Sequence, residues 1–520
     1  MTDKDYLRAQ RELWEPATGP NGMSRRKFLQ ALGVGAGAAL AAPSLMSRFE
    51  AFAADDSTTD GILVLVMLGG GNDGLNTLVP FNDGKYRSLR PALRYNPPGA
   101  GTRGVLSIND ANFGLNPNLP RLKARYLQNR VAFVRGVGYN PSDMSHFTSM
   151  GYWMNGWKDA PPQQFANGWV GRYMDSLPGA STNALLGACI GSSVPLHMIG
   201  TSARAAGIPQ DIGGAFGLNR SKPYDARMFD AFAAYGNTPT GKGQWADLVA
   251  KTNKSSMTVA QAVQPAYAGA LGGDDLVRQL TLTARLINLN LGTRVFHTHL
   301  SSFDTHGDQE SMHSRLLASL DAGIEALFAN LSATQRPRVT LLTFSEFGRR
   351  PDEASNGTDH GAAGLDIVVG DKVKGGIYGE QPSLTDLDSH GNLKASTDFR
   401  AVYAEMLDSW LGADPVPILG KDYPRLGLFT GAPASPTTST TLPPVVTTIT
   451  TQPPATTTTT QPPATTTTPQ PPGTTTTTRP PGTTTTTQPP GTTTTTQPTT
   501  TPGTLPRRRR PRRWRGRPFS

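Results

Sequence analysis

Short apolar runs recur along the middle of the chain, between about residues 60 and 370. Each has the length of a strand and lacks clean alternation of apolar and polar positions, which is typical of strands buried on both faces of a parallel sheet. The segments 275–289, 311–331 and 398–411 instead repeat apolar residues at helical spacing. This alternation predicts a doubly wound α/β domain, with a mostly parallel central sheet and helices on both faces. The predicted strands are 62–68, 131–137, 184–190, 294–300, 339–344 and 365–369.

The predicted domain spans residues 54–430, and the amino-acid composition of the chain changes sharply after it. Within it, residues 200–290 carry few recognisable motifs, and we expect the segment 213–241 to be a loop-rich insertion that shapes specificity. Residues 431–506 are mainly Thr and Pro, with a repeated nine-residue unit, and have too few apolar side chains to offset the entropy of ordering. We expect a disordered stalk, reaching roughly 200 Å when extended as polyproline II. It is either a spacer that crosses a cell wall or a linker without a partner.

The formal net charge is +10, but the excess lies at one end of the chain. The tail at 507–520 contains eight arginines, Arg479 is a ninth, and no acidic residue follows Asp422. Without these nine arginines the net charge is +1, so the folded domain is nearly neutral. Nucleic acid is therefore not the expected partner. We expect the Arg-rich tail to contact an anionic cell-wall polymer or a membrane surface, or to have no specific role.

The first 53 residues have the order of a Tat-type, twin-arginine export signal. Arg25 and Arg26 precede a weakly apolar run at 31–43, and the small-residue site at 51–53 follows. The run has about 13 residues, too few for a membrane span of about 20. We expect the Tat translocon as a partner during export, and a location outside the cytoplasm, in the cell envelope or secreted. The alternative is an amphipathic helix with an incidental arginine pair.

Polar residues follow the first two long strands at their carboxyl ends, where sites gather in α/β folds. Asp73 comes after a glycine-rich turn that lacks the spacing of a dinucleotide-binding loop. It is either a site residue or the cap of an ordinary Asn-Asp-Gly turn. Ser145 lies where a helix is expected to begin. It is a hydroxyl nucleophile, part of a phosphate pocket at the helix N-terminus, or simply the N-cap of that helix.

Later strands end in loops that contain carboxylates and imidazoles. Asp304 and His306 follow the strand at 294–300, and Glu346 follows the strand at 339–344. Arg349 could hold an oxyanion through two hydrogen bonds. His360 belongs to a second, glycine-rich Asp-His loop. Each of these loops alone is also compatible with a solvated polar loop, but together they predict convergence on one sheet edge.

This convergence predicts a hydrolytic site for one or two metal ions. The expected cofactor is a divalent ion, and Zn, Mn, Mg and Ca all remain open. The single cysteine, Cys189, excludes intramolecular disulfides and any cluster built from several cysteines, so the ligands are oxygen and nitrogen atoms. His297 and His299 share one strand face and are expected to be structural.

At these motifs the chain resembles the Tat-exported domain-of-unknown-function 1501 family, over about residues 60–412. The matching motifs include Gly-Gly-Asn-Asp-Gly-Leu-Asn at 70–76, Ser-His-Phe at 145–147, Phe-Asp-Thr-His at 303–306, Ser-Glu-Phe-Gly-Arg at 345–349 and Thr-Asp-His-Gly at 358–361. That family in turn resembles the alkaline phosphatase/sulfatase superfamily, which has a metal site at the strand ends of a mixed sheet. The resemblance therefore implies an alkaline phosphatase-like fold.

The superfamily resemblance also implies a role for each position. Asp73 would ligate one metal ion, and Asp304 with His306 would ligate the other. Ser145 falls near the nucleophile position, and His360 matches a late histidine ligand. The resemblance places Glu346 where the superfamily has an Asp-His pair after a strand.

Two functions are compatible with these residues. The first is a metal-dependent hydrolase of phosphate or sulfate esters at the cell envelope, in which Ser145 or a water attacks and Arg349 neutralises developing charge. The second is a non-catalytic envelope protein that binds an anionic glycan or wall polymer with a degenerate phosphatase-like fold. The pair Ser345-Glu346, standing in place of Asp-His, favours the second.

Overall fold

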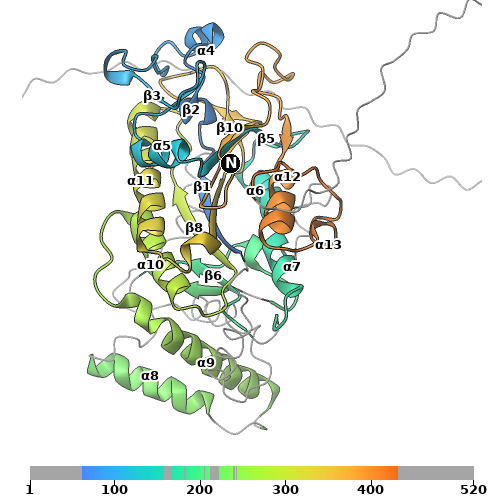
Figure 1. The fold of residues 1–520 in the computed structure, drawn as a ribbon. Helices are drawn as coiled ribbons and strands as arrows, with labels where there is room; N and C mark the ends of the chain where they lie inside the picture. Colours follow the sequence, from blue (N-terminus) through green and yellow to red (C-terminus); the bar gives the residue numbers. More distant parts are fainter. Residues whose placement is uncertain are drawn as a thin grey trace, which may run out of the picture. The chain divides into compact units, whose positions relative to one another are not determined.

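A nine-stranded sheet organises the described part of the chain (Figure 1). The structure is a computed structural model and describes residues 61–156, 166–180, 183–191, 193–203, 205–210, 222–237, 241 and 243–430. The strands of the sheet are β1 (Ile62–Gly69), β5 (Val131–Gly138), β6 (Gly187–Ile190), β7 (Ala206–Ile208), β8 (Val295–Ser301), β9 (Val339–Phe344), β12 (Gly364–Gly370), β13 (Gly376–Tyr378) and β14 (Thr397–Asp398). Their order is β13-β5-β12-β9-β1-β8-β6-β7, and β14 also pairs with β5.

Most neighbouring strands of this sheet run parallel, which confirms the predicted fold class. β1 is parallel to both of its neighbours, β8 and β9, and β6 is parallel to β7 and β8. β13 and β14 are parallel to β5. In contrast, β12 is antiparallel to both β5 and β9. The first residues of β12 therefore lie at the edge where the parallel strands end.

Helices cover both faces of the sheet, and the sheet separates the two largest apolar clusters (Figure 1). Val64 and Val66 of β1 belong to one cluster, and Leu63 and Leu65 to the other. This burial on both faces explains why the strand sequences do not alternate. The first cluster is covered by α5 (Pro120–Leu127), α10 (Asp275–Asn288) and α11 (Gln309–Asn330), and the second by α6 (His146–Asn155), α7 (Trp169–Asp175), α12 (Phe399–Glu405) and α13 (Pro415–Leu419).

Smaller elements lie outside the main sheet. β2 (Leu78–Val79), β4 (Gly114–Leu115) and β3 (Leu106–Ser107) form a three-stranded sheet, and β10 (Gly348–Arg349) pairs with β11 (His360–Gly361). The remaining α-helices are α4 (Gly84–Leu89), α8 (Pro223–Gly236) and α9 (Gln244–Val263). Single turns of helix are η1 (Gly74–Asn76), η2 (Gly101–Arg103), η4 (Leu196–Met198), η5 (Gln264–Tyr267), η6 (Arg336–Arg338) and the π-helix η7 (Met406–Trp410).

The predicted elements agree with the structure except in three segments. The strand at 184–190 begins three residues late, at Gly187, and the helix at 398–411 is α12 followed by the π-helical turn η7. The predicted loop-rich insertion at 213–241 is wrong for residues 223–236, which form α8. Pro223 starts this helix, and Phe229 is buried on its inner side, so apolar spacing outweighs the glycines on either side.

The last described residues, up to residue 430, pack against the domain. The buried carboxylate of Glu405 accepts hydrogen bonds from the backbone N–H groups of Leu426, Gly427 and Leu428 at 2.8–3.1 Å. Phe429 stacks on Trp410 with ring centroids 5.0 Å apart. The predicted signal at 1–53, stalk at 431–506 and tail at 507–520 lie outside the described residues. No described helix combines the length and the apolar composition of a membrane span.

Candidate metal centre

Loops from several parts of the chain meet at one edge of the sheet. β1, β8 and β9 are parallel and end at this edge. Because β12 runs antiparallel, the β10–β11 hairpin that precedes it reaches the same edge. β5 also ends here, and α6 follows it. The structure thereby brings Asp304, His306, Glu346 and His360 together and adds His146, the first residue of α6.

The carboxylate of Asp304 lies among three histidines. Its Oδ1 is 2.9 Å from His306 Nε2 and 3.0 Å from His360 Nε2. Its Oδ2 is 3.4 Å from His146 Nε2. Ligand atoms of His146, Asp304 and His360 all lie within 4.8 Å of one another. Two imidazoles and a carboxylate at this spacing fit a transition-metal site that keeps a position open for a water or a substrate.

The outer nitrogens of two of these histidines contact hydrogen-bond acceptors. His146 Nδ1 lies 2.8 Å from Glu346 Oε1, and His360 Nδ1 lies 2.9 Å from the carbonyl oxygen of Met144. A carboxylate and a carbonyl only accept, so Nδ1 carries the proton in both rings. In the neutral form of each ring, Nε2 then carries the lone pair, on the side that faces Asp304. Histidines that bind metals commonly have such an outer partner, which fixes their tautomer and orientation.

Glu346 supports the same centre from a buried position. Its side chain is 3% exposed, and Oε1 also accepts the Gly70 N–H at 2.9 Å. Oε2 is buried and has no hydrogen-bond partner among the described residues. A buried carboxylate oxygen is costly to leave unpaired, so an ion or an ordered water is expected beside it. Glu346 therefore orients His146 and offers a further oxygen to the centre.

The groups around Asp304 favour positive charge at this point. Burial lowers the pKa of His146, but the hydrogen bonds that its ring donates to Asp304 and Glu346 outweigh burial and raise that pKa to about 9. Burial raises the pKa of Asp304, but hydrogen bonds from His146, His360 and Arg349 bring it well below its usual range. Protons and metal ions compete for such a site, so these residues fit a divalent cation.

Arg349 does not lie where a substrate could reach it. Its side chain is fully buried, and Nη2 donates to Asp304 Oδ1 at 2.7 Å. This placement does not support the predicted role of Arg349 in holding an oxyanion, because its donors are used within the protein. Arg349 instead joins strand-end loops and orients Asp304. The carbonyl oxygens that accept its other hydrogen bonds are those of Gly70, Gly71, Phe303 and Thr358.

Asp73 lies outside the histidine cluster, in a buried ion pair. Its Oδ2 is 2.6 Å from Arg90 Nη1 and also accepts from Gln309 Nε2, while Oδ1 caps η1 through the Asn76 N–H. Burial raises the pKa of Asp73, but Arg90, together with His313, brings it below the usual range. The structure therefore supports the turn-capping interpretation of Asp73, since its charge is already neutralised, and does not place it with the other predicted metal ligands.

Ser145 is the N-cap of α6. Its Oγ accepts from the Thr148 N–H at 3.5 Å, and its own N–H donates to Asp143 Oδ1 at 2.7 Å. The residue is exposed and directly precedes His146 in the chain. The cap interpretation is therefore confirmed, and the hydroxyl also stays accessible one residue from the centre.

Two residues of the centre had no role assigned from the sequence. His146 belongs to the Ser-His-Phe motif, and its contact with Asp304 depends on how α6 begins after β5. Asp359 precedes His360, and its Oδ1 lies 3.7 Å from His306 Nδ1. His306, Asp359 and His360 form a second group of ligand atoms within 4.8 Å of one another. In the sequence, the only signal for His146 and Asp359 is that each is adjacent to a predicted site residue, Ser145 and His360 respectively.

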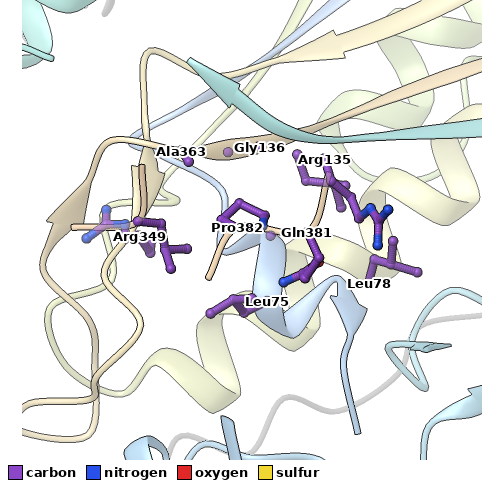
Figure 2. Close-up of a pocket in the computed structure, with 12 residues that line it drawn as sticks. Leu75, Leu78, Arg135, Gly136, Arg349, Ala363, Gln381 and Pro382 are labelled. Atoms are coloured by element: carbon purple, nitrogen blue, oxygen red, sulfur yellow. The ribbon is translucent and has the colours of Figure 1, made fainter. Parts of the chain in front are cut away.

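Two hollows border the loops of the site. A cavity of about 20 Å³ is lined by Arg349, Leu75, Arg135 and Gln381, among others (Figure 2). That volume holds about one water molecule. An open cleft of about 460 Å³ lies on the loops next to His306. Of the two, only the cleft has room for a substrate. Its lining is polar, with Asp308, Glu310, Ser311, Ser314 and Asn356, besides Ala92 and Leu93.

Residues 132–408 match the family described as protein of unknown function (DUF1501), and they make up more than half of the chain. The chain therefore belongs to this family, in agreement with the resemblance of its motifs. None of the curated proteins compared with the chain matches it.

Solved structures also match, and the three named here have low sequence identity to this chain. A protein in the alkaline phosphatase superfamily from Vibrio parahaemolyticus is 9% identical with a TM-score of 0.30, over 77% of this chain and 80% of its own. A sulfatase from Pseudoalteromonas sp. is 12% identical with a TM-score of 0.29, over 72% and 73%. The lipoteichoic acid synthase LtaP from Listeria monocytogenes is 8% identical with a TM-score of 0.27, over 68% and 81%. At this level of similarity, they carry no argument about the activity of this chain.

Proposed function

We propose that the protein is a divalent-metal-dependent hydrolase that acts on phosphate or sulfate esters. The observation that carries the proposal is the convergence of His146, Asp304 and His360, with both histidines held in the tautomer that metal binding needs. The side chain of Asp304 is 31% exposed and that of His306 is 46% exposed, so this side of the centre is open to a substrate.

A divalent ion bound there would supply Lewis acidity to an ester oxygen and would acidify a water molecule. His146 Nε2, His360 Nε2 and the Asp304 carboxylate would hold the ion, with His306 beside them. These donors fit Zn²⁺ or Mn²⁺ better than Ca²⁺ or Mg²⁺, both of which prefer oxygen ligands. The geometry thus favours the first two of the four metals predicted from the sequence.

The chain's own residues prepare the rest of the site. Glu346 and the Met144 carbonyl orient the two histidine rings, and Arg349 orients Asp304 by donating a hydrogen bond to its Oδ1. The hydroxyl of Ser145 is the nucleophile in this proposal, because it is exposed at the start of α6 and adjoins His146. The backbone N–H groups of the first turn of α6 favour negative charge on that oxygen.

The test is an assay of ester hydrolysis after controlled metal exchange. The protein is stripped with a chelator, reloaded with Zn²⁺, Mn²⁺, Mg²⁺ or Ca²⁺ in turn, and assayed with aryl phosphate and aryl sulfate esters. We expect hydrolysis by the Zn²⁺ or Mn²⁺ form, lost in Asp304→Asn and His360→Gln without loss of folding. Asp386→Asn and His390→Gln are matched controls, because both residues are exposed in one loop. Tight metal binding without hydrolysis of any ester would contradict the proposal and favour the binding function.

We also propose that this chemistry takes place outside the cytoplasm. The proposal is supported by the twin arginines, apolar run and cleavage site of residues 1–53, and by the Arg-rich tail, whose partner would be an anionic wall polymer or membrane surface. Replacement of Arg25 and Arg26 by Lys is expected to leave the protein inside the cytoplasm, as measured by cell fractionation. Unchanged export of that variant would contradict the proposal.

A further inference from the structure

Helices α8 and α9 form a hairpin, hereafter the α8–α9 hairpin, which lies away from the proposed metal centre. The two helices pack against each other, and α9 leads into η5 (Figure 1). In Figure 1 they lie together at the lower end of the molecule, opposite to α4 and β10. Phe229 of α8 and Met257 of α9 are buried. The other faces of both helices have no role in the proposed hydrolysis.

Exposed apolar side chains concentrate on this hairpin. Trp245 is 76% exposed, Tyr224 66%, Tyr235 42% and Val249 37%. These are four of the seven large apolar side chains that are exposed in the described part of the chain. Tyr235 is the last residue but one of α8 and Trp245 is the second residue of α9, so both lie next to the connection between the helices. Val249 follows one turn of helix later, and Tyr224 lies at the other end of α8. Such a concentration marks an interaction surface more often than chance exposure does.

The types of these residues match the boundary between lipid and water. Trp and Tyr combine an apolar ring with one polar group and are enriched where a bilayer meets water. The exposed charged side chains of the hairpin and its entry are mostly basic, with Lys222, Arg227 and Lys254 against Asp230. Basic residues next to apolar anchors favour a surface of anionic lipid headgroups.

The exposed apolar area of the hairpin favours a bilayer over a protein as the partner. From the usual area of an aromatic side chain, the four exposed residues offer roughly 400 Å², whereas a stable protein interface buries about 800 Å² on each partner. A bilayer needs less, because a few inserted side chains and nearby basic groups give reversible binding. This summed area is therefore small for a dimer and adequate for a peripheral membrane contact.

We propose that the α8–α9 hairpin docks on the surface of an anionic lipid bilayer, with Trp245 and Tyr235 inserted among the headgroups. This contact does not depend on the metal centre or on the proposed hydrolysis. It is also separate from the predicted contact of the Arg-rich tail, because it uses aromatic insertion at the domain itself.

The proposal is tested with the full-length protein and vesicles of phosphatidylglycerol and phosphatidylcholine in equal parts. Partitioning is measured by vesicle sedimentation for the wild type and for the double variant Trp245→Ser/Tyr235→Ser. The affinity of the variant for the vesicles is expected to be at least about tenfold lower, because two apolar contacts are lost. Leu127→Ser and Val416→Ser are controls of similar exposure on other helices, 50% and 43% in the wild type, and should bind as the wild type does. Since the Arg-rich tail is present in every variant, the difference isolates the hairpin.

A second readout is quenching of tryptophan fluorescence by brominated lipid, compared between the wild type and Trp245→Phe. We expect a quenched component in the wild type that the variant lacks. Equal partitioning of the double variant and the wild type, or no quenched component from Trp245, would overturn the proposal. So would a concentration-dependent dimer without lipid that Trp245→Ser abolishes, because the partner would then be a second copy of the chain.

Discussion

Glu346 contacts His146 Nδ1 through one carboxylate oxygen, and its other oxygen is buried without a partner among the described residues. Glu346→Gln keeps the shape of the side chain but removes its charge. Outer partners of metal-binding histidines typically change metal affinity by about 10–100-fold, so we expect weakening of that size. Competition with a chelator measures it, and Glu325→Gln is the control, since Glu325 is paired at the surface with Arg125. An unchanged affinity would show that Glu346 does not act on the centre.

The buried pair His197 and His297 gives a prediction about pH and stability. His197 Nε2 lies 3.1 Å from His297 Nδ1, and burial lowers the pKa of His197 to about 3 and that of His297 well below its usual range. Both rings therefore stay neutral in the folded protein, whereas the unfolded chain gains protons below about pH 6.5. The free energy of unfolding should then fall with falling pH, by up to about 1.4 kcal/mol per pH unit for each histidine.

His197→Phe removes one of these two protonation sites. Urea unfolding of the variant should show a distinctly shallower loss of stability than the wild type between about pH 6 and pH 4. The same replacement at the exposed His390 should leave the slope unchanged. Equal slopes for the wild type and His197→Phe would mean that His197 is not held neutral by the fold.

Part of the site could be predicted residue by residue, because several of its residues directly follow predicted strands. Asp304, His306, Glu346 and His360 follow strands or a loop of the same sheet edge, and the structure brings them together. The partners of Asp73 and Arg349 depend on tertiary packing, which the sequence does not show. Arg90 at the end of α4 neutralises Asp73, and four backbone carbonyl oxygens from three loops surround Arg349.

At the scale of elements, the buried strands were predictable because burial on both faces requires apolar runs. The direction of β12 was not, since an apolar run has the same pattern in either direction. Its antiparallel course nevertheless decides that His360 reaches the site. The start of α6 was predictable from Ser145, but the direction in which its first residue, His146, points was not.

Two variants at the start of α6 distinguish the helix-capping role of Ser145 from its proposed role as nucleophile. Ser145→Ala removes both the hydroxyl and the helix cap and should cost about 1 kcal/mol of stability. Ser145→Asn removes the hydroxyl but keeps a good cap, so its stability should equal that of the wild type within a few tenths of a kcal/mol. If Ser145 is the nucleophile, both variants should lose a factor of at least about 100 in kcat. Chemical unfolding and the ester assay measure the two effects, and an active Ser145→Asn would contradict the nucleophilic role.

At the scale of the whole molecule, the contacts of Glu405 predict where the domain can end. A chain that stops after Thr430 should keep the unfolding midpoint of the full-length protein, because Leu428 and Phe429 retain their places in the core. A chain that stops after Tyr423 should lose about 3–5 kcal/mol, since the buried Glu405 carboxylate loses three N–H partners. Thermal and chemical unfolding measure both. Equal stability of the two truncated chains would contradict this role of Glu405.

The account depends most on the claim that His146, Asp304 and His360 hold a divalent ion. Anomalous X-ray scattering from crystals of the Zn²⁺- or Mn²⁺-loaded protein tests it most directly. The account predicts one strong peak at about 2.0–2.3 Å from His146 Nε2, His360 Nε2 and a carboxylate oxygen of Asp304. An ion bound elsewhere, for instance at Asp73, or no peak between these three residues would contradict it.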